Sequence, residues 1–86
     1  MNIYVGNLDF QVNENDLERT FKKYGSVSSA KIITDKYSGR SKGFGFVIME
    51  DATEASEAIN ELNGTILKNR DMTVNEAKPK KENFFK

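Results

Sequence analysis

Residues 42–49 read Lys-Gly-Phe-Gly-Phe-Val-Ile-Met, and this stretch decides how the rest of the sequence is interpreted. Its side chains alternate as in a strand that buries one face, with two bare glycines set against two large aromatic residues. Lysine is almost never fully buried without a partner, so we expect Lys42 to face outward. Phe44 and Phe46, which share its parity, then face outward as well. The alternative is that the phenylalanines are core and the glycines face solvent.

Three other segments show the same alternation. In residues 2–6 the apolar set is Ile3 and Val5, which leaves Tyr4 on the face away from the core. Residues 27–34 and 72–76 also read as strands. Their outward sets are Ser29, Lys31 and Ile33 in the first, and Thr73 and Asn75 in the second. Tyr4 therefore joins Phe44 and Phe46, and an exposed cluster of rings is typical of a binding surface.

The first of two helical segments follows Asn13, a candidate N-cap. Leu17, Phe21 and Tyr24 recur on one face of it, and Gly25 is expected to end it.

The second helix is expected to begin at Asp51, with Glu54 completing an approximate capping box, and to stop at residues 63–64. We expect its inner stripe to be Ala52, Ala55, Ile59 and Leu62. Residues 35–41 form a polar loop. A small turn before the last strand is expected to place Asn69 in a left-handed conformation.

The resulting order is β-α-β-β-α-β, which predicts an α+β, ferredoxin-like fold. Two helices of about three turns can cover only one face of a four-stranded antiparallel sheet, so the other face must meet solvent or a partner. We expect one domain over residues 1–79 and a short, flexible C-terminal tail over residues 80–86.

Composition excludes several kinds of site. The 86 residues contain neither cysteine nor histidine, which removes the commonest ligands for metals and the commonest general base. No apolar run approaches the ~20 residues of a membrane helix. We expect a cytoplasmic monomer that uses no metal or cofactor and does not associate with membranes.

The charges cancel, with thirteen acidic and thirteen basic residues, but they are segregated along the chain. The two expected helices carry mostly acids, which are Glu14, Asp16, Glu18, Asp51, Glu54, Glu57 and Glu61. Strands, loops and tail carry most of the bases, which are Lys31, Lys36, Arg40, Lys42, Lys68, Arg70, Lys78, Lys80 and Lys81. Such a dipolar molecule can offer a surface that favours phosphate at zero net charge.

Two stretches resemble the signatures of a known family. Residues 3–8, Ile-Tyr-Val-Gly-Asn-Leu, and residues 42–49 resemble the hexapeptide and octapeptide of the RNA recognition motif family, at a matching separation. The resemblance covers residues 1–79 and extends to small bacterial proteins with a single motif and to plant glycine-rich RNA-binding proteins. Met49 departs from the usual aromatic, which should affect packing more than binding. Asn69 replaces a common glycine, and a glycine-rich tail is absent.

The resemblance implies binding of single-stranded RNA, in post-transcriptional regulation or RNA chaperoning. Tyr4 and Phe44 would stack on successive bases, and Phe46 would pack against or between sugars. Phosphate or polar contacts are expected from Lys31, Arg40, Lys42 and Lys78. Base edges would be read by the side chains and backbone of Thr73, Asn75, Glu76 and Ala77. Asn7 is expected only to cap the turn after the first strand.

Three other functions are alternatives to RNA binding. Single-stranded DNA is the hardest to separate, because stacking barely distinguishes it from RNA. A protein–protein interaction module would use the helical side, but such modules usually lack the exposed rings. Small phosphatases share this fold and need an arginine in the loop after the first strand. Residues 7–13 contain no arginine or lysine and no nucleophile–base pair is evident, so we expect no enzymatic activity.

Overall fold

The computed structural model describes residues 1–77, which fold in the expected order with one addition. The elements are β1 Asn2–Gly6, α1 Glu14–Lys22, β2 Ser29–Thr34, β3 Ser41–Ile48, α2 Ala52–Leu62, β4 Ile66–Leu67, β5 Arg70–Asp71 and β6 Thr73–Glu76. The addition is the β4–β5 hairpin, at a place where the sequence predicts only a small turn. The expected tail, residues 80–86, and Lys78 lie outside the described residues.

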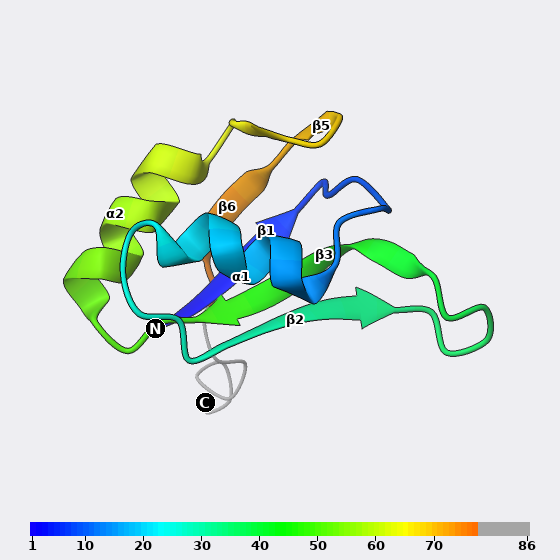
Figure 1. The fold of residues 1–86 in the computed structure, drawn as a ribbon, viewed down its shortest axis with the longest axis horizontal. Coiled ribbons are helices and arrows are strands. Elements are labelled where there is room, and N and C mark those ends of the chain that lie inside the picture. Colours follow the sequence, from blue (N-terminus) through cyan, green and yellow to red (C-terminus); the bar gives the residue numbers. More distant parts are fainter. Residues whose placement is uncertain (78–86) are drawn as a thin grey trace, which may run out of the picture.

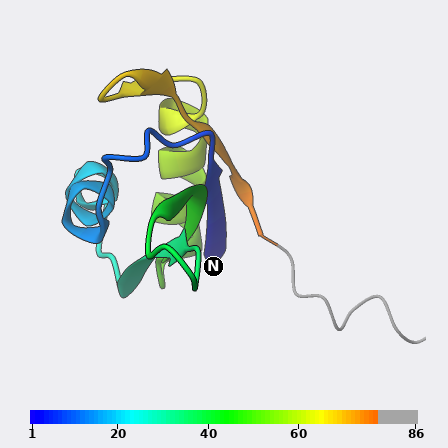
Figure 2. The same ribbon diagram turned by 90° about the vertical axis from the view of Figure 1, so that its right-hand side faces the viewer.

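The main sheet has the order β2-β3-β1-β6, and every neighbouring pair is antiparallel. Tyr4 in the central strand β1 lies opposite Phe46 of β3 on one side and Asn75 of β6 on the other. Both helices lie on one side of this sheet (Figure 1), and the view from the side shows the same separation (Figure 2). The predicted α+β, ferredoxin-like architecture with one open sheet face is confirmed.

The core lies between the sheet and the two helices. Its fully buried members come from the inward set of each strand and from one stripe of each helix, and they include Ile3, Val5, Leu17, Phe21, Val47, Met49, Ala55, Ala58 and Val74. Phe44 and Phe46 are not among them, because β3 turns Gly43, Gly45 and Val47 inward. The alternative in which the phenylalanines are core is therefore wrong.

Helix α1 begins with a complete capping box. The Asn13 Oδ1 accepts the Asp16 N–H at 2.8 Å, and the Asp16 carboxylate accepts the Asn13 N–H at 3.2 Å. The helix ends at Lys22, earlier than expected, because the Tyr24 N–H bonds to the Phe21 carbonyl and tightens the last turn. Tyr24 still packs, half-buried, against the core.

Helix α2 departs from expectation at its start. Asp51 caps it by accepting the Glu54 N–H at 3.0 Å, but the Glu54 carboxylate accepts the N–H of Ser26, so the expected box has only its first half. Ala52, expected on the inner stripe, is exposed in the first turn. The inner stripe is instead Ala55, Ala58 and Leu62, with Ile59 half-buried beside it.

Gly43 and Gly45 of β3 leave room for neighbouring segments of the chain. On the helix face of a sheet, a missing side chain could let a helix lie close. A Cβ at position 45 would instead collide with the carbonyl oxygen of Lys31 in β2. A Cβ at position 43, where φ is +86°, would come within 3.2 Å of the Phe10 ring. The missing side chains thus fit β3 against its neighbouring strand and against the β1–α1 loop.

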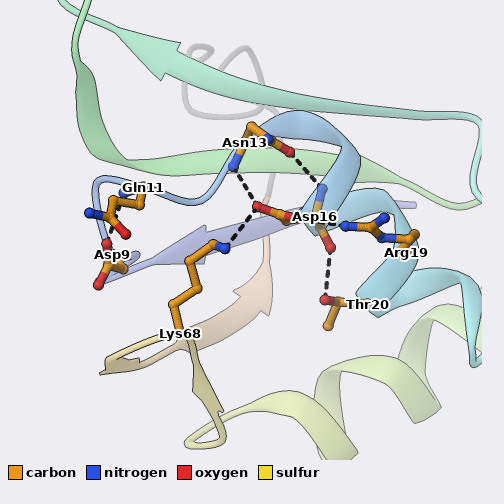
Figure 3. A network of polar contacts seen from close by, with 7 residues as sticks. All are labelled: Asp9, Gln11, Asn13, Asp16, Arg19, Thr20 and Lys68. Atoms are coloured by element: carbon orange, nitrogen blue, oxygen red, sulfur yellow. Dashed lines mark hydrogen bonds and ion pairs between the residues drawn. The ribbon is translucent and has the colours of Figure 1, made fainter.

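The β4–β5 hairpin is held against the rest of the domain by Lys68. This residue, and not Asn69, has the left-handed conformation, with φ of 61°. Its Nζ lies 3.5 Å from Oδ2 of Asp16, which also caps α1 and pairs with Arg19 (Figure 3). One carboxylate therefore joins the start of α1 to a turn more than fifty residues later in the chain.

Candidate functional site

Three aromatic side chains meet on the open face of the sheet. Tyr4 comes from the central strand β1, and Phe44 and Phe46 come from β3 beside it. Their ring centroids are 6.0 Å apart for Tyr4–Phe44, 5.9 Å for Tyr4–Phe46 and 6.3 Å for Phe44–Phe46. Each is half-buried, so each keeps part of its surface in solvent. We call these three residues the ring platform.

The ring platform is not flat. The planes of Tyr4 and Phe44 are tilted by 33°, whereas Phe46 meets them edge-on, at 64° and 89°. Edge-to-face contacts of this kind are favourable because the positive rim of one ring meets the negative face of another. Tyr4 and Phe44 can therefore offer two similarly oriented faces, while Phe46 presents a differently directed apolar surface beside them.

Polar side chains surround the ring platform at the positions that the sequence analysis expected. Lys31 of β2 lies opposite Phe46 in the register and is exposed. Thr73 and Asn75 of β6 are exposed on the other side, in register with Gly6 and Tyr4. Lys42, also exposed, comes from β3 itself. The open face thus combines apolar rings with ammonium, hydroxyl and amide groups.

Two residues expected to read base edges are placed differently. Glu76 pairs with Ile3, so its side chain lies on the helix side of the sheet, which leaves its backbone as the part that could contact a base. Ala77 has the right parity, but its N–H donates to the Asn2 carbonyl at 2.9 Å and is not free. The expected contact from Lys78 falls outside the described residues.

Arg40 is exposed in a loop that its own backbone and Asp35 hold in shape. The Asp35 N–H donates to the Arg40 carbonyl at 2.8 Å, and the Asp35 carboxylate accepts the N–H groups of Tyr37 and Ser38. These two backbone donors hold the pKa of Asp35 below its usual value; burial opposes them, and nearby Lys42 lowers the pKa further. Arg40 is therefore presented on an ordered turn.

Three residues beside the ring platform were not expected to take part in binding, and they are Asn7, Phe10 and Arg70. Phe10, exposed in the β1–α1 loop, and Arg70 of β5 line a hollow together with Tyr4, Lys42 and Phe44. The Arg70 Nη2 donates to Oδ1 of Asn7 at 2.8 Å, and the Asn7 Nδ2 donates to the Asp71 carbonyl at 2.7 Å.

Asn7 was expected only to cap a turn. It does end β1 in a left-handed conformation, with φ of 53°, but it also orients Arg70. Loop residues carry no periodicity, and the two partners are 63 positions apart, so the sequence held no local signal of this contact.

Within residues 1–77, no group of three acidic, histidine or cysteine side chains is placed to hold a metal ion. Neither helix of that part of the chain is long and apolar enough to cross a membrane.

Comparison with known proteins places this surface in a family. The profile described as RNA recognition motif matches residues 3–73. The RNA-binding protein RbpA of Synechocystis sp. is 48% identical over 80 residues, which are 93% of this chain and 79% of that protein. Glycine-rich RNA-binding protein 8 of Arabidopsis thaliana is 50% identical over 74 residues, or 86% of this chain, which spans 44% of that longer protein.

Two solved structures of RNA-binding proteins superpose closely on this chain. The crystal structure of the RNA-binding protein PG1 superposes with a TM-score of 0.88 at 50% identity and covers 93% of this chain and 99% of that one. A complex of the Sex-lethal protein with RNA superposes with a TM-score of 0.84 at 37% identity, covering 88% and 47%. The fold, the two signature strands and these similarities lead to one conclusion. The chain belongs to the RNA recognition motif family.

Proposed function

We propose that this protein binds single-stranded RNA by stacking unpaired bases on the ring platform. The observation that carries the proposal is the meeting of Tyr4, Phe44 and Phe46, with centroids about 6 Å apart, on the sheet face opposite the helices. Every base has a π-face, so aromatic rings hold a single strand with little need for a fixed sequence. Bases in a duplex are already stacked and hidden, which favours unpaired RNA as the partner.

The geometry suggests a role for each ring. Tyr4 and Phe44, tilted by only 33°, can each take one base of a dinucleotide. Phe46 stands edge-on to both and suits the sugars between those bases. Lys42 and Lys31 border the rings on β3 and β2 and can pair with the phosphates, while Thr73 and Asn75 can hydrogen-bond to base edges from β6.

The distribution of charge also favours the open sheet face as the RNA-binding surface. The chain carries no net charge, but the acids of α1 and α2 lie on the elements that cover the other side of the sheet. Phosphates approaching the open face therefore meet mainly lysine and arginine. The names of the relatives and the RNA bound to Sex-lethal favour RNA over DNA as the partner. We further propose that the protein acts as a cytoplasmic monomer in post-transcriptional regulation or RNA chaperoning, by binding and without catalysis.

The test compares Tyr4→Ala and Phe44→Ala with the unmodified protein. Each substitution should weaken binding of a short single-stranded RNA by ~1–3 kcal/mol, because it removes the stacking of one base. Ile66→Ala, which removes an exposed apolar side chain on the β4–β5 hairpin, is the control and should bind as the unmodified protein does. Circular dichroism establishes that each variant is folded. Unchanged affinity in folded Tyr4→Ala and Phe44→Ala proteins contradicts the stacking mechanism.

Two further measurements separate the competing functions. Single-stranded DNA of the same sequence should bind more weakly if the 2′-hydroxyl is read, and equally if stacking alone decides. NMR shifts during the titration should fall on the ring platform. Shifts confined to α1 and α2, with no response to RNA at the rings, would support a protein-interaction module instead.

A further inference from the structure

The four-stranded sheet ends in two edge strands, β2 and β6. In Figure 1, β2 forms the lower edge of the sheet. The backbone of an edge strand has N–H and C=O groups that point away from the sheet, and a strand of another chain can pair with them. The way in which each edge is closed therefore decides whether two copies of the protein can join their sheets.

A carboxylate of α1 occupies the edge of β2. Oε2 of Glu14 accepts the N–H of Ile32 at 3.1 Å, so this N–H points away from β3. Ala30, two positions earlier, has the same backbone direction. Glu14 is the first residue of α1 and is held in place by the capping box of Asn13 and Asp16. A carboxylate is a stronger acceptor than the carbonyl of an incoming strand, and its negative charge repels that carbonyl.

Two other features of β2 make pairing with a second strand less favourable without preventing it. The register with β3 shifts between Ile32 and Thr34, and an irregularity of this kind bends the end of the strand. Lys31 is exposed, and two β2 strands side by side would bring two such lysines close together. However, the bend leaves residues 29–32 regular, and a lysine can extend its ammonium into solvent. Glu14 is thus the group that occupies the hydrogen-bonding position itself.

The opposite edge, at β6, is closed by two means. Asn63, the C-cap of α2, accepts the Val74 N–H through Oδ1 at 2.9 Å. The backbone that follows Asn63 also pairs with the beginning of this edge. The Gly64 N–H donates to the Met72 carbonyl at 2.8 Å, and the Met72 N–H donates to the Thr65 carbonyl at 2.8 Å. The β6 edge therefore remains partly covered by backbone when the Asn63 side chain is removed.

We propose that the β2 edge is a self-association surface that Glu14 keeps closed, and that this closure keeps the protein monomeric. The partner that fits the edge is a second copy of the chain. Two β2 strands related by a two-fold axis present the same N–H and C=O groups to each other and can pair antiparallel. The proposal rests on the monomeric state proposed above and is independent of base stacking on the ring platform.

The test measures sedimentation in the analytical ultracentrifuge at protein concentrations from about 10 μM to about 1 mM. Glu14→Ala should form a dimer whose fraction rises with concentration, whereas the unmodified protein should remain monomeric. Glu14→Gln keeps a side-chain oxygen that can accept the Ile32 N–H, so it should remain mainly monomeric. Circular dichroism establishes that each variant is folded.

Two control variants should also remain monomeric. Asn63→Ala removes the side-chain acceptor at the β6 edge, where the backbone of Gly64 and Thr65 still covers the strand. Glu57→Ala removes an exposed carboxylate of α2 and so reproduces the loss of charge without opening an edge. Dimerisation of Glu57→Ala to the same extent as Glu14→Ala would show that charge, and not the closed edge, prevents association, and would overturn the proposal.

A second readout reports on the edge directly. Hydrogen exchange of the Ile32 amide, followed by NMR in dilute protein, should be at least about ten-fold faster in Glu14→Ala than in the unmodified protein. The same amide should become protected again at high concentration, when it pairs with the β2 strand of the second copy. The Val74 amide is the internal reference, because its acceptor Asn63 is unchanged in Glu14→Ala.

The outcomes distinguish this proposal from the proposed function. If Glu14→Ala remains monomeric at every concentration, or if its Ile32 amide exchanges no faster, Glu14 does not close the edge and the proposal is wrong. If Glu14→Ala dimerises without protecting the Ile32 amide, the two copies meet elsewhere and the proposal fails as well. If the unmodified protein is itself a dimer, the monomeric state fails together with this inference. Dilute Glu14→Ala should bind single-stranded RNA as the unmodified protein does, so that base stacking is tested separately.

Discussion

The ring of Tyr4 lies over Gly6, in the space that a side chain at position 6 would occupy. A Cβ built on Gly6 would stand 2.8 Å from Cε2 and Cζ of the Tyr4 ring. Both residues belong to β1 and share the open face, so the glycine of the hexapeptide has a direct role at the ring platform. Because Gly6 has no side chain, the Tyr4 side chain can extend along its own strand and its ring can pack directly over the backbone of residue 6.

Gly6→Ala should therefore weaken RNA binding while leaving the fold stable. The added methyl would push the ring of Tyr4 aside, and the end of a flexible side chain can move without disturbing the backbone. We expect a loss in affinity of about 1 kcal/mol, at the lower end of the value for one stacked base. RNA titration together with urea unfolding measures both effects. Wild-type affinity would show that the position of the Tyr4 ring over Gly6 is unimportant.

Gly45→Ala, in contrast to Gly6→Ala, should destabilise the fold. Its methyl would meet the carbonyl of Lys31, a backbone group of β2 that cannot move without disturbing the pairing of β2 with β3. Overpacking of this kind typically costs ~1–3 kcal/mol, and we expect the upper part of that range. Urea unfolding monitored by circular dichroism measures the change. A Gly45→Ala protein as stable as the unmodified one would mean that β2 and β3 can separate at this point without loss.

The free energy of unfolding should decrease in acid, and protonation of Asp16 should account for part of the decrease. The Asn13 N–H lowers the pKa of this carboxyl most, burial opposes that effect, and Lys68 and Arg19 lower it further. A carboxyl whose pKa is lower in the folded state stabilises the fold above its unfolded pKa, about 3.9, and loses that contribution as the pH falls through the folded value. Asp16→Asn should therefore be less stable at neutral pH and lose less stability below about pH 4.

The measurement is the free energy of unfolding between neutral pH and about pH 3. Glu57→Gln removes an exposed carboxylate of α2 and is the control, which should follow the unmodified protein. Parallel curves for Asp16→Asn and the unmodified protein across the acid range would contradict the role given to the contacts of Asp16 (Figure 3).

Salt should weaken RNA binding only moderately. The exposed cations around the ring platform can neutralise about two to four phosphates, which predicts a slope of log K against log salt of about −1.4 to −2.8 for a single strand. Arg70→Gln should make the slope about 0.7 shallower if Arg70, oriented by Asn7, contacts a phosphate. An unchanged slope would leave Arg70 with only its hydrogen bond to Asn7. A much steeper slope in the unmodified protein would mean that binding is mainly electrostatic.

The ring platform could be predicted from the sequence because strand alternation is a local property. Lys42 indicated which face of β3 is outward, and Tyr4 followed from the apolar parity of Ile3 and Val5. The same rule places Glu76 on the face of Val74, so only its backbone could take the expected part in reading a base edge. Helix ends were less certain, because bonds such as that from Tyr24 to Phe21 depend on how the chain leaves the helix.

By itself, the sequence determined the element order, the open sheet face and the three rings on it, since periodicity and parity are carried by neighbouring residues. Only the tertiary structure decided what borders those rings. Phe10 rests beside Gly43, Arg70 is held by Asn7, and Gly45 is fitted against Lys31. These contacts join loops and strands that are distant in the chain, and no local pattern specifies which of them will meet when the sheet and its helices pack together.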